Sequence, residues 1–573
     1  MKLNNFFQYK RFKLGKGNII QKIYFGFLRW LVRKKYPNWR KIFKKDHTFW
    51  KNSINSAKKG PKILISATIG IHPSVIVLEG YLGMALTLRG ADVYYLLCDE
   101  FLLGCQVHSF NKMDIISEKW NPKRLCRKCF NPGYKSFSST GLPVLKYSEN
   151  ITSGEFQKAE DISKNLDIKD IANFSIDGFN IGEHIMAGAL KFFARGTLEN
   201  EPYAEKVLRQ YLKSSILTAY VINHLIDTHH FDCAVFHHGI YVPEGVIGEV
   251  CRKKGVRVVN WNPAYRKQCF IFSHRDTYHH TLMSEPTEKW ENIKWNSKIE
   301  KEITDYLESR TTGGKDWISF VGKNPEFDLT KISQELGGID FSKPCIGMLT
   351  NVIWDAQLHY PANIFKNMVE WIIKTIKYFS KRQDLQLIIR IHPAEILGEL
   401  PSRQQVLDEI KKEFPNLPPN IFIIKPESSI STYAVMEQCN AVIIYGTKSG
   451  VELTSRGIPV IVAGEAWIRN KGLTIDPKSQ DEYFKVLDQL PLPQKMSEEQ
   501  IKRAKKYAFH FFYRRMIPVS QIEITGSIPP FKVKISNINK MLPGNDIGLD
   551  VICNGILKGT DFIYPAEVLL TEG

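Results

Sequence analysis

Two series of short apolar runs, each alternating with helical segments, constrain the fold of this chain more than any other feature of its sequence. In the first series, the runs at 63–65 and 93–97 flank a helical stretch at 74–88. The same strand, helix and strand return at 233–260, after a mostly helical region at 150–230. Because a strand, a crossing helix and a second strand in this order form a βαβ unit, the pattern predicts a parallel sheet.

The second series begins at residue 344 and is more regular than the first. Its five apolar runs alternate with helical segments, and a long helix is predicted near 495–515. The predicted strands cover residues 345–351, 385–393, 420–426, 441–446 and 459–464. A Gly-rich polar stretch at 313–343 separates the two series. We therefore predict two α/β domains rather than one.

The predicted domain boundaries follow from these two series. A basic arm covers 1–60, the first α/β domain 61–335 and the second 340–495. Residues 496–573 hold the long helix, which can pack across both domains, and a small appendage. The appendage, with the sequence PGNDIGLDVICNGILKGTDF, is predicted to be β-rich, and no function is assigned to it.

The basic residues of the chain are concentrated in its N-terminal arm. Residues 1–60 hold 17 Lys and Arg against one acid, Asp46, so they carry +16 of the total charge of +19. Six apolar residues of the arm recur at helical spacing, with Lys and Arg on the other faces: Ile20, Ile23, Tyr24, Phe27, Leu28 and Leu31. This pattern is typical of an amphipathic helix on an anionic membrane surface. A basic helix packed on its own protein would show the same pattern.

Two absences in the sequence bear on the cellular location. No apolar run reaches the roughly 20 residues needed to span a bilayer, and the N-terminus has no apolar core or cleavage site of a signal peptide. We therefore expect a cytoplasmic protein, peripheral on the inner face of the cell membrane. The charge would also attract nucleic acid, but no nucleic-acid-binding motif accompanies it, so we expect no nucleic-acid partner.

Polar side chains gather where the strands of the second series end. In doubly wound sheets, ligands bind outside the carboxyl ends of the strands. Helix N-termini at these ends bind anions through free N–H groups and the helix dipole. Cations, hydroxyls and amides together fit a phosphate-bearing ligand. The predicted ligand-binding residues are Arg390, His392, Pro393, Lys425, Ser428, Ser429, Thr447, Ser449, Gly450 and Glu452.

Glu452 has two interpretations. On the first turn of the helix that starts near Gly450, its carboxylate could accept hydrogen bonds from ribose or sugar hydroxyls. Alternatively, Ser449 is an ordinary N-cap and Glu452 is its capping-box partner three residues on. The second interpretation leaves His392 and Ser428 unexplained at the equivalent strand ends.

The segments RIHPAE and KPESSISTYAVMEQCNAVIIYGTKSGVELTSRGIPVIVAG, with the spacing between them, resemble the C-terminal half of bacterial capsule polysaccharide biosynthesis glycosyltransferases. That group includes the capsule Kdo transferases and, more distantly, bacterial sialyl- and polysialyltransferases. The resemblance is specific over 344–480 and weaker over 61–330. It implies the GT-B fold, in which two Rossmann-like α/β domains with parallel sheets face a cleft.

The resemblance also implies roles for individual residues. It places a nucleotide-sugar donor on the C-terminal domain, with its phosphate held by His392 and Pro393 and by the helix start at Thr447, Ser449 and Gly450.

Two further positions bear on the donor. Glu452 matches the Glu of the family's following helix, whereas Lys448 departs from the pattern, because a small or hydroxyl residue is expected there. A CMP-sugar and a UDP- or GDP-sugar are both compatible donors. The expected acceptor is a glycan or glycolipid.

GT-B transferases generally need no bound metal for catalysis, because cations and helix dipoles stabilise the departing phosphate. An inverting transferase also needs a general base for the acceptor hydroxyl. We expect this base on a loop of the first domain, where the candidates are His72, His237, His238 and Glu244. Each of these residues can also be structural or bind the acceptor.

Four of the ten cysteines fall within one short stretch: Cys98, Cys105, Cys126 and Cys129. In an intracellular chain, C-x2-C with two further thiols nearby indicates a metal site rather than disulfides. Four thiolates suit a structural zinc, and an iron–sulfur cluster has less support. Plain reduced thiols are the alternative.

The leading hypothesis is a metal-independent glycosyltransferase that builds a surface glycan such as a capsule, an exopolysaccharide or a lipopolysaccharide. A sugar-nucleotide epimerase of the same fold is one alternative, although an enzyme of soluble sugars has no need for a membrane-binding arm. A non-catalytic scaffold of a polysaccharide assembly complex is another. The joint presence of Arg390, His392, Ser449 and Glu452 argues against that second alternative.

Overall fold

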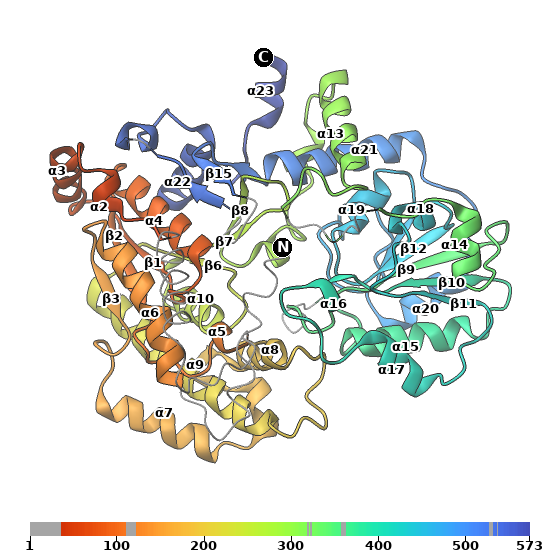
Figure 1. The fold of residues 1–573 in the computed structure, drawn as a ribbon, viewed down its shortest axis with the longest axis horizontal. Coiled ribbons are helices and arrows are strands. Elements are labelled where there is room, and N and C mark those ends of the chain that lie inside the picture. Colours follow the sequence, from red (N-terminus) through yellow and green to blue (C-terminus); the bar gives the residue numbers. More distant parts are fainter. Residues whose placement is uncertain are drawn as a thin grey trace, which may run out of the picture.

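The computed structural model describes residues 36–109, 122–317, 320, 324–356, 362–525, 531–535 and 537–572. It consists of two α/β domains, one to each side of Figure 1, joined by helices that run between them. In each domain the first strand lies in the middle of the sheet, the next two lie on one side of it and the later ones on the other. This is the predicted pair of Rossmann-like domains, and the GT-B fold class is confirmed.

The N-terminal domain is built on a seven-stranded sheet of order β14-β8-β7-β6-β1-β2-β3. Its strands are β1 (Lys62–Ser66), β2 (Asp92–Leu97), β3 (Val144–Lys146), β6 (Cys233–His237), β7 (Arg257–Pro263), β8 (Cys269–His274) and β14 (Ile517–Pro518). The five strands from β7 to β3 are parallel, as predicted, whereas β8 is antiparallel to β7, and β14 is antiparallel to β8. β8 was not predicted as a strand. It returns along β7 in a hairpin, which needs only a short loop.

Helices cover both faces of this sheet, and each face has its own hydrophobic core. They are α4 (Pro73–Thr87), α5 (Gln106–Ser109), α6 (Pro122–Ser138), α7 (Ser153–Asn165), α8 (Gly182–Phe193), α9 (Ala204–His229) and α10 (Glu244–Lys253). A 3₁₀ helix (Ile168–Asn173) and a small hairpin of β4 (Ser175–Ile176) and β5 (Phe179–Asn180) lie between α7 and α8. Helix α4 is buried along almost its whole length because other helices pack over it.

The end of the predicted arm belongs to this domain. Residues 39–57 form α2 (Trp39–Ile42) and α3 (His47–Ala57), and the side chains of Trp39 and Phe43 are 1% and 3% exposed. The indole N–H of Trp50 donates to the carbonyl of Thr140 over 2.6 Å. The boundary predicted at residue 60 is therefore wrong, since these aromatic residues complete the N-terminal core. The amphipathic helix predicted over 20–31 lies outside the described residues.

The C-terminal domain has a five-stranded sheet of order β11-β10-β9-β12-β13, in which every pair is parallel. The strands are β9 (Cys345–Leu349), β10 (Gln386–Arg390), β11 (Ile421–Ile424), β12 (Ala441–Ile444) and β13 (Val460–Val462). The helices of this domain are α14 (Leu329–Glu335), α15 (Met368–Phe379), α16 (Ala394–Leu397), α17 (Val406–Glu413), α18 (Thr432–Met436), α19 (Ser449–Thr454) and α20 (Gln480–Asp488). All five predicted strands are confirmed, because apolar runs buried on both faces signal a parallel sheet.

The segment between the two sheets packs with the C-terminal domain. It forms α11 (Tyr278–Thr281), α12 (Glu288–Glu291) and α13 (Ser297–Ser309), which share a core with the second sheet and with α21 (Glu498–Phe509). The ring of Trp290 lies 5.2 Å from that of Tyr507, and the ring of Tyr306 lies 4.9 Å from that of Phe512. The domain boundary predicted near residue 335 is therefore too late.

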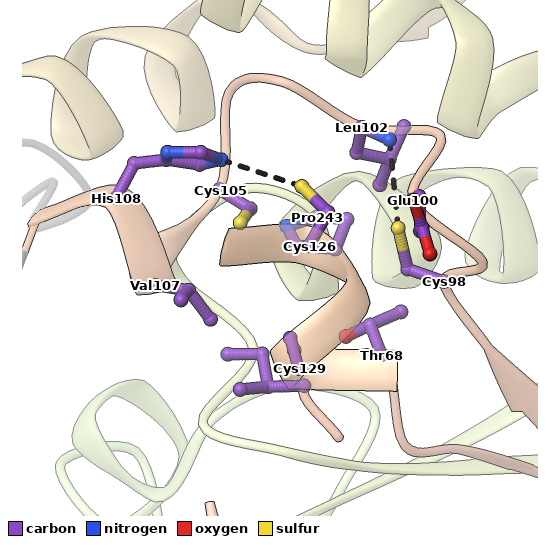
Figure 2. A pocket seen from close by; sticks show the side chains of 11 residues that line it. Thr68, Cys98, Glu100, Leu102, Cys105, Val107, His108, Cys126, Cys129 and Pro243 are labelled. Atoms are coloured by element: carbon purple, nitrogen blue, oxygen red, sulfur yellow. Dashed lines mark hydrogen bonds between the residues drawn. The ribbon is translucent and has the colours of Figure 1, made fainter. Parts of the chain in front are cut away.

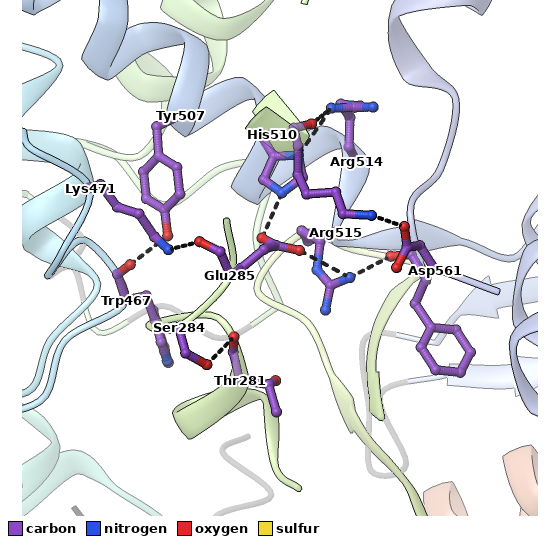
Figure 3. A network of polar contacts seen from close by, with 12 residues as sticks. Thr281, Ser284, Glu285, Trp467, Lys471, Tyr507, His510, Arg514, Arg515 and Asp561 are labelled. Atoms are coloured by element: carbon purple, nitrogen blue, oxygen red, sulfur yellow. Dashed lines mark hydrogen bonds and ion pairs between the residues drawn. The ribbon is translucent and has the colours of Figure 1, made fainter. Parts of the chain in front are cut away.

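Helix α21 and the π-helix that follows it (His510–Arg514) run between the domains, as predicted. A buried ionic network fixes them there (Figure 3). The carboxylate of Glu285 accepts from Nε2 of His510 over 2.8 Å and lies 3.6 Å from the guanidinium of Arg515. From the C-terminal domain, Lys471 donates to the carbonyls of Met283, over 3.1 Å, and of Glu285.

The C-terminal appendage is mostly helical, so the predicted β-rich structure is wrong. A hairpin of β15 (Ile522–Ile524) and β16 (Phe531–Val533) is followed by a 3₁₀ helix (Ile538–Met541), α22 (Ile547–Lys558) and α23 (Ala566–Glu572). Asp546 caps α22 by accepting from the N–H of Leu549 over 3.0 Å, and Gly559 ends it with φ of 73°. None of the described helices is both long and apolar enough to cross a membrane.

Candidate active site

A cavity of about 590 Å³ lies between the two domains, at the carboxyl ends of both sheets. From the C-terminal domain it is lined by the loops that follow β9 to β13, and from the N-terminal domain by residues at the ends of β6 and β7. This is the position at which doubly wound sheets bind their ligands. Its volume is in the range of small-molecule sites.

Seven of the ten residues predicted to bind the donor line this cavity: Arg390, His392, Pro393, Ser428, Ser429, Thr447 and Ser449. They follow three different strands, β10, β11 and β12, that lie on both sides of β9. Parallel strands bring their carboxyl ends to one edge, and this is why positions far apart in the sequence meet here.

His392 presents a hydrogen-bond donor to the cavity. Its Nδ1 accepts from the backbone N–H of Ala394 over 3.0 Å, so the proton of the neutral ring lies on Nε2. Burial, together with Lys448 and Arg390, lowers the pKa of His392 to about 3. The ring is therefore neutral at physiological pH and can donate from Nε2 to an anion.

Arg390 shapes the loop that follows β11. Its guanidinium donates to the carbonyls of Lys425 and Ser428, the latter over 3.4 Å, and its Nε donates to Oγ1 of Thr432 over 3.2 Å. Burial lowers its pKa to about 10, which leaves it a cation. The side chain thus adds positive charge to the cavity and fixes one of its walls.

Glu452 lies beneath the cavity rather than in its wall. Its side chain is 1% exposed, and its carboxylate accepts from Lys448 over 3.1 Å and from the hydroxyl of Tyr433, and it forms an ion pair with Arg310 at 3.0 Å. Burial alone would raise its pKa, but Arg310 and then Lys448 lower it to about 2. Glu452 is therefore occupied in holding two cations.

Three predicted donor-binding residues do not line the cavity, and their assignments are corrected. Glu452 is saturated by its neighbours. Lys425 is exposed outside it, because only its backbone carbonyl turns inward, towards Arg390. Gly450 serves packing, since a Cβ there would lie 2.7 Å from the side chain of Ile444.

The local geometry also excludes the capping-box interpretation. Ser449 is the first residue of α19, and no side chain caps this helix. Instead, the hydroxyl of Thr447 accepts from the N–H of Ser449 over 3.3 Å.

Lys448, the departure from the family pattern, is in the wall of the cavity. Its ammonium group is anchored by Glu452 and lies 4.9 Å from the centre of the Tyr265 ring. Burial lowers its pKa, and Arg310 lowers it further. The lysine therefore supplies the cavity with a cation that is fixed from below.

Of the candidate bases, the structure places only His238 in the cavity wall. Its ring lies 4.9 Å from that of Tyr241 and 5.8 Å from that of His279. Glu244 is 3% exposed and accepts from Thr68 over 2.6 Å and from Gln106 over 3.0 Å. Burial raises its pKa. Glu244 thus belongs to a buried hydrogen-bonded group, and its assignment as a candidate base is corrected.

His72 and His237 lie near the cleft but outside the cavity lining. His72 precedes α4 without capping it, and burial lowers its pKa while Glu399 of the C-terminal domain opposes that shift. His237 ends β6, with its ring 4.8 Å from that of Trp261, and burial lowers its pKa to about 3.

Sequence reasoning missed several titratable residues of the cavity wall, among them His279, Asp355 and Glu465. Asp355 accepts from the hydroxyl of Tyr241 across the domain interface. Burial lowers the pKa of His279 to about 4. Glu465 lies three residues after the last residue of β13. The expectation that ligands bind at the carboxyl ends of the strands, which led to His392, therefore applies to Glu465 as well.

The pKa of Glu465 lies near neutrality. Its side chain is 1% exposed, and burial raises its pKa to about 7. Nε2 of His280, in the N-terminal half of the chain, lies 3.6 Å from its carboxylate, and Nδ1 of the same ring lies 2.8 Å from Asp276. A carboxyl group with this pKa can exchange a proton at physiological pH.

The four clustered cysteines also come together, in a second cavity of the N-terminal domain (Figure 2). Cys98, Cys105, Cys126 and Cys129 line it with His108. All four are free thiols.

Residues 348–503 match the family model described as "Capsule polysaccharide biosynthesis protein". No curated protein matches the chain.

Similar solved structures include two of Thermosulfurimonas dismutans KpsC, one described as a β-Kdo 2,4-transferase and one as a β-Kdo 2,7-transferase. The β-Kdo 2,4-transferase is 10% identical, with coverage of 55% of this chain and 88% of that one and a TM-score of 0.34. The β-Kdo 2,7-transferase is 13% identical, with coverage of 56% and 87% and a TM-score of 0.29. UDP-GlcNAc 2-epimerase from Neisseria meningitidis, bound to UDP-GlcNAc, is 11% identical, with coverage of 78% and 94% and a TM-score of 0.25.

The matched segment runs from β9 to α21 and contains every predicted donor-binding residue. The resemblance seen in the sequence is thereby confirmed: residues 348–503 are similar to the capsule polysaccharide biosynthesis protein family.

Proposed function

We propose that this protein is a glycosyltransferase that moves a sugar from a nucleotide-sugar donor to the glycan acceptor of a surface polysaccharide. One observation carries the proposal: a single cavity joins an anion-binding strand edge of one domain to titratable side chains of the other. Transfer between two substrates requires such a two-sided site. A sugar-nucleotide epimerase acts on one substrate and has no need of the second side.

The donor phosphate would bind at the ends of β10 and β12. There, Nε2–H of His392, the ammonium of Lys448 and the hydroxyls of Thr447 and Ser449 face the cavity. These donors are fixed before the ligand arrives, so they would stabilise the charge that develops on the departing phosphate. Lys448 and Arg390 supply positive charge here, and we propose that transfer needs no bound metal.

We assign the proton-accepting role to Glu465 and acceptor binding to His238. Glu465 has a pKa of about 7, so a large fraction is ionised at neutral pH and can take a proton from an acceptor hydroxyl. His238 lines the cavity from the N-terminal domain, where an acceptor would enter. Membrane attachment through the basic residues 1–35 would bring the enzyme to a lipid-linked acceptor.

The proposal is tested by nucleotide binding to the purified full-length protein. Thermal shift with CMP, CDP, UDP, GDP and TDP should single out one nucleotide, because a ligand of the native state raises its stability by mass action. The response should be lost in His392→Ala and kept in His224→Ala, a control histidine exposed on α9. A CMP response would favour a Kdo- or sialate-type donor.

Other results would favour the alternatives. If UDP binds, conversion of UDP-GlcNAc to its 2-epimer without any acceptor would identify an epimerase. If no nucleotide shifts the folded protein, the transferase proposal fails and the scaffold remains.

A further inference from the structure

Four thiols that are separated in the sequence converge on one cavity of the N-terminal domain. Cys98 directly follows β2, and Cys105 directly precedes α5. Cys126 and Cys129 are one turn apart on α6, so both lie on the same face of that helix. Figure 2 shows these side chains around the space that they share with His108. The other six cysteines do not line this cavity.

The backbone around the cavity closes tightly on the cysteines. The N–H of Leu102 donates to Sγ of Cys98 over 3.4 Å, and amides at Ile71 and Val107 act in the same way on Cys129 and Cys105. A Cβ at Gly70 would lie 2.4 Å from the carbonyl oxygen of Cys129, so only glycine lets this loop approach α6. Amide hydrogen bonds to sulfur are a regular feature of thiolate ligands.

Four thiols and one carboxylate surround the cavity. The described lining includes no Lys or Arg, and its one carboxylate, Glu100, adds negative charge. Coordination to a metal ion would favour the thiolate over the thiol at these cysteines.

We propose that Cys98, Cys105, Cys126 and Cys129 ligate an iron–sulfur cluster through their thiolates. Each thiol loses its proton when its sulfur binds iron. A single zinc ion fits less well, because among the described side chains no three His, Cys, Asp or Glu residues are close enough together to share one ion. In a cluster of four irons and four sulfides each thiolate takes its own iron, so the four cysteine sulfurs stand farther apart than around one zinc.

The cluster would act as a structural link rather than in sugar transfer. The cavity is separate from the interdomain one and is bordered by Thr68 and Pro243. It joins the segment 98–108 to α6 at the carboxyl edge of the sheet. Thr68 also donates to Glu244, so the link lies one hydrogen bond from the loop that carries His238.

The test measures metal directly on the full-length protein, purified without oxygen and after reconstitution with ferrous iron and sulfide. We expect iron and acid-labile sulfide in equal amounts, with the broad visible absorption of thiolate-to-iron charge transfer. Cys126→Ser and Cys98→Ser should lose this absorption and most of the iron. Cys251→Ser, which removes a buried thiol of α10 outside the cavity, should keep both.

If the variants do not fold, the metal and sulfide content of the wild-type protein alone tests the proposal. One zinc per chain without iron would overturn the cluster. A third result would overturn the metal site altogether. In that case the protein binds neither metal, and a thiol reagent modifies the four cysteines equally before and after reconstitution. None of these results depends on transferase activity, so the two proposals can fail separately.

Discussion

The carboxylate of Glu452 lies 3.1 Å from the ammonium of Lys448 and holds it in the wall of the interdomain cavity. The same carboxylate pairs with Arg310 of the preceding segment at 3.0 Å. Two buried cations thus share one anion, and the position of Lys448 depends on a residue that no ligand would touch. Glu452 is accordingly a positioning residue.

Replacing Glu452 by Gln should therefore both destabilise the protein and weaken nucleotide binding. Loss of one partner from a buried ion pair typically costs about 3–5 kcal/mol, so Tm should fall by several degrees. The pKa of Glu452 falls from 4.5 unfolded to about 2 folded, so its stabilisation is present above pH 4.5 and lost as the pH falls towards 2. When the free energy of unfolding is measured against pH, it should fall less steeply below pH 4.5 in Glu452→Gln than in the wild-type protein.

The control for this prediction is Glu437→Gln, which removes a largely exposed surface partner of Arg456. It should change Tm little, as exposed pairs contribute about 0–1 kcal/mol. Unchanged nucleotide binding in Glu452→Gln would contradict the positioning role.

Substitution of His392 should act on the donor rather than on the fold. Loss of a hydrogen bond to a charged phosphate costs about 1.5–3 kcal/mol, so His392→Ala should weaken nucleotide binding about 10- to 100-fold. His392→Gln can place an amide N–H near the position of Nε2 and should recover part of the affinity. Calorimetric titration measures both, and equal losses in the two variants would argue against a hydrogen-bond donor at this position.

Glu465 should set the pH dependence of transfer. Because burial raises its pKa to about 7, kcat/KM should rise with pH through about 7 and level off above it. Glu465→Gln should abolish this limb and most of the activity, whereas His238→Ala should mainly raise the KM for the acceptor. An unaltered pH profile in Glu465→Gln would exclude the carboxylate as the base.

Through Glu465, the stability of the protein should depend on pH in the opposite direction to kcat/KM, which means that it should fall as the pH rises. Its folded pKa exceeds the unfolded value of 4.5, so the folded state holds the proton more tightly between pH 4.5 and 7. Stability from this group is lost as the pH rises through that window, and Glu465→Gln should remove the loss. The free energy of unfolding of the wild-type protein and of Glu465→Gln, measured at pH 5 and at pH 8, tests this expectation.

The network around Glu285 should hold the crossing helix in place (Figure 3). Arg514 donates to Nδ1 of His510 over 3.2 Å, so the ring donates from Nε2 to Glu285 while remaining neutral. Burial lowers the pKa of His510, in agreement with this tautomer. Arg515 is then the cation nearest to the carboxylate.

Glu285→Gln should lower the free energy of unfolding by about 3 kcal/mol, because Arg515 loses its buried partner. Burial alone would raise the pKa of Glu285, but Arg515, His510 and Lys471 together lower it from 4.5 to about 2. Its contribution is therefore present above pH 4.5 and lost as the pH falls below it. Glu300→Gln, at an exposed contact of α13 with Lys505, is a matched control that should have little effect on unfolding.

The sequence predicted the C-terminal sheet well because its strands are buried on both faces and read as continuous apolar runs. The strand-end rule then found His392 and Ser449. It missed Glu465 only because it was not applied after β13. Partnerships such as Arg310 with Glu452 had no signal, since these residues are far apart in sequence and meet only in the folded core.

Two failures have local explanations. The Val and Ile residues of helix α22 favour strands, but Asp546 and Gly559 mark its two ends as caps. Strand β14 has two residues, too few for any periodicity, and pairs with β8. Such a strand is defined by its partner and not by its own sequence.

The pairing of β14 with β8 also orders events during synthesis. The N-terminal sheet lacks its outer edge until Ile517 and Pro518 have left the ribosome, by which time the whole C-terminal domain has been made. The first domain must therefore wait, with β8 uncovered, while the second one forms. A chain that stops after the family-matched segment would leave that edge open to other strands, so a frameshift near the 3′ end of the gene would harm the half of the protein encoded first.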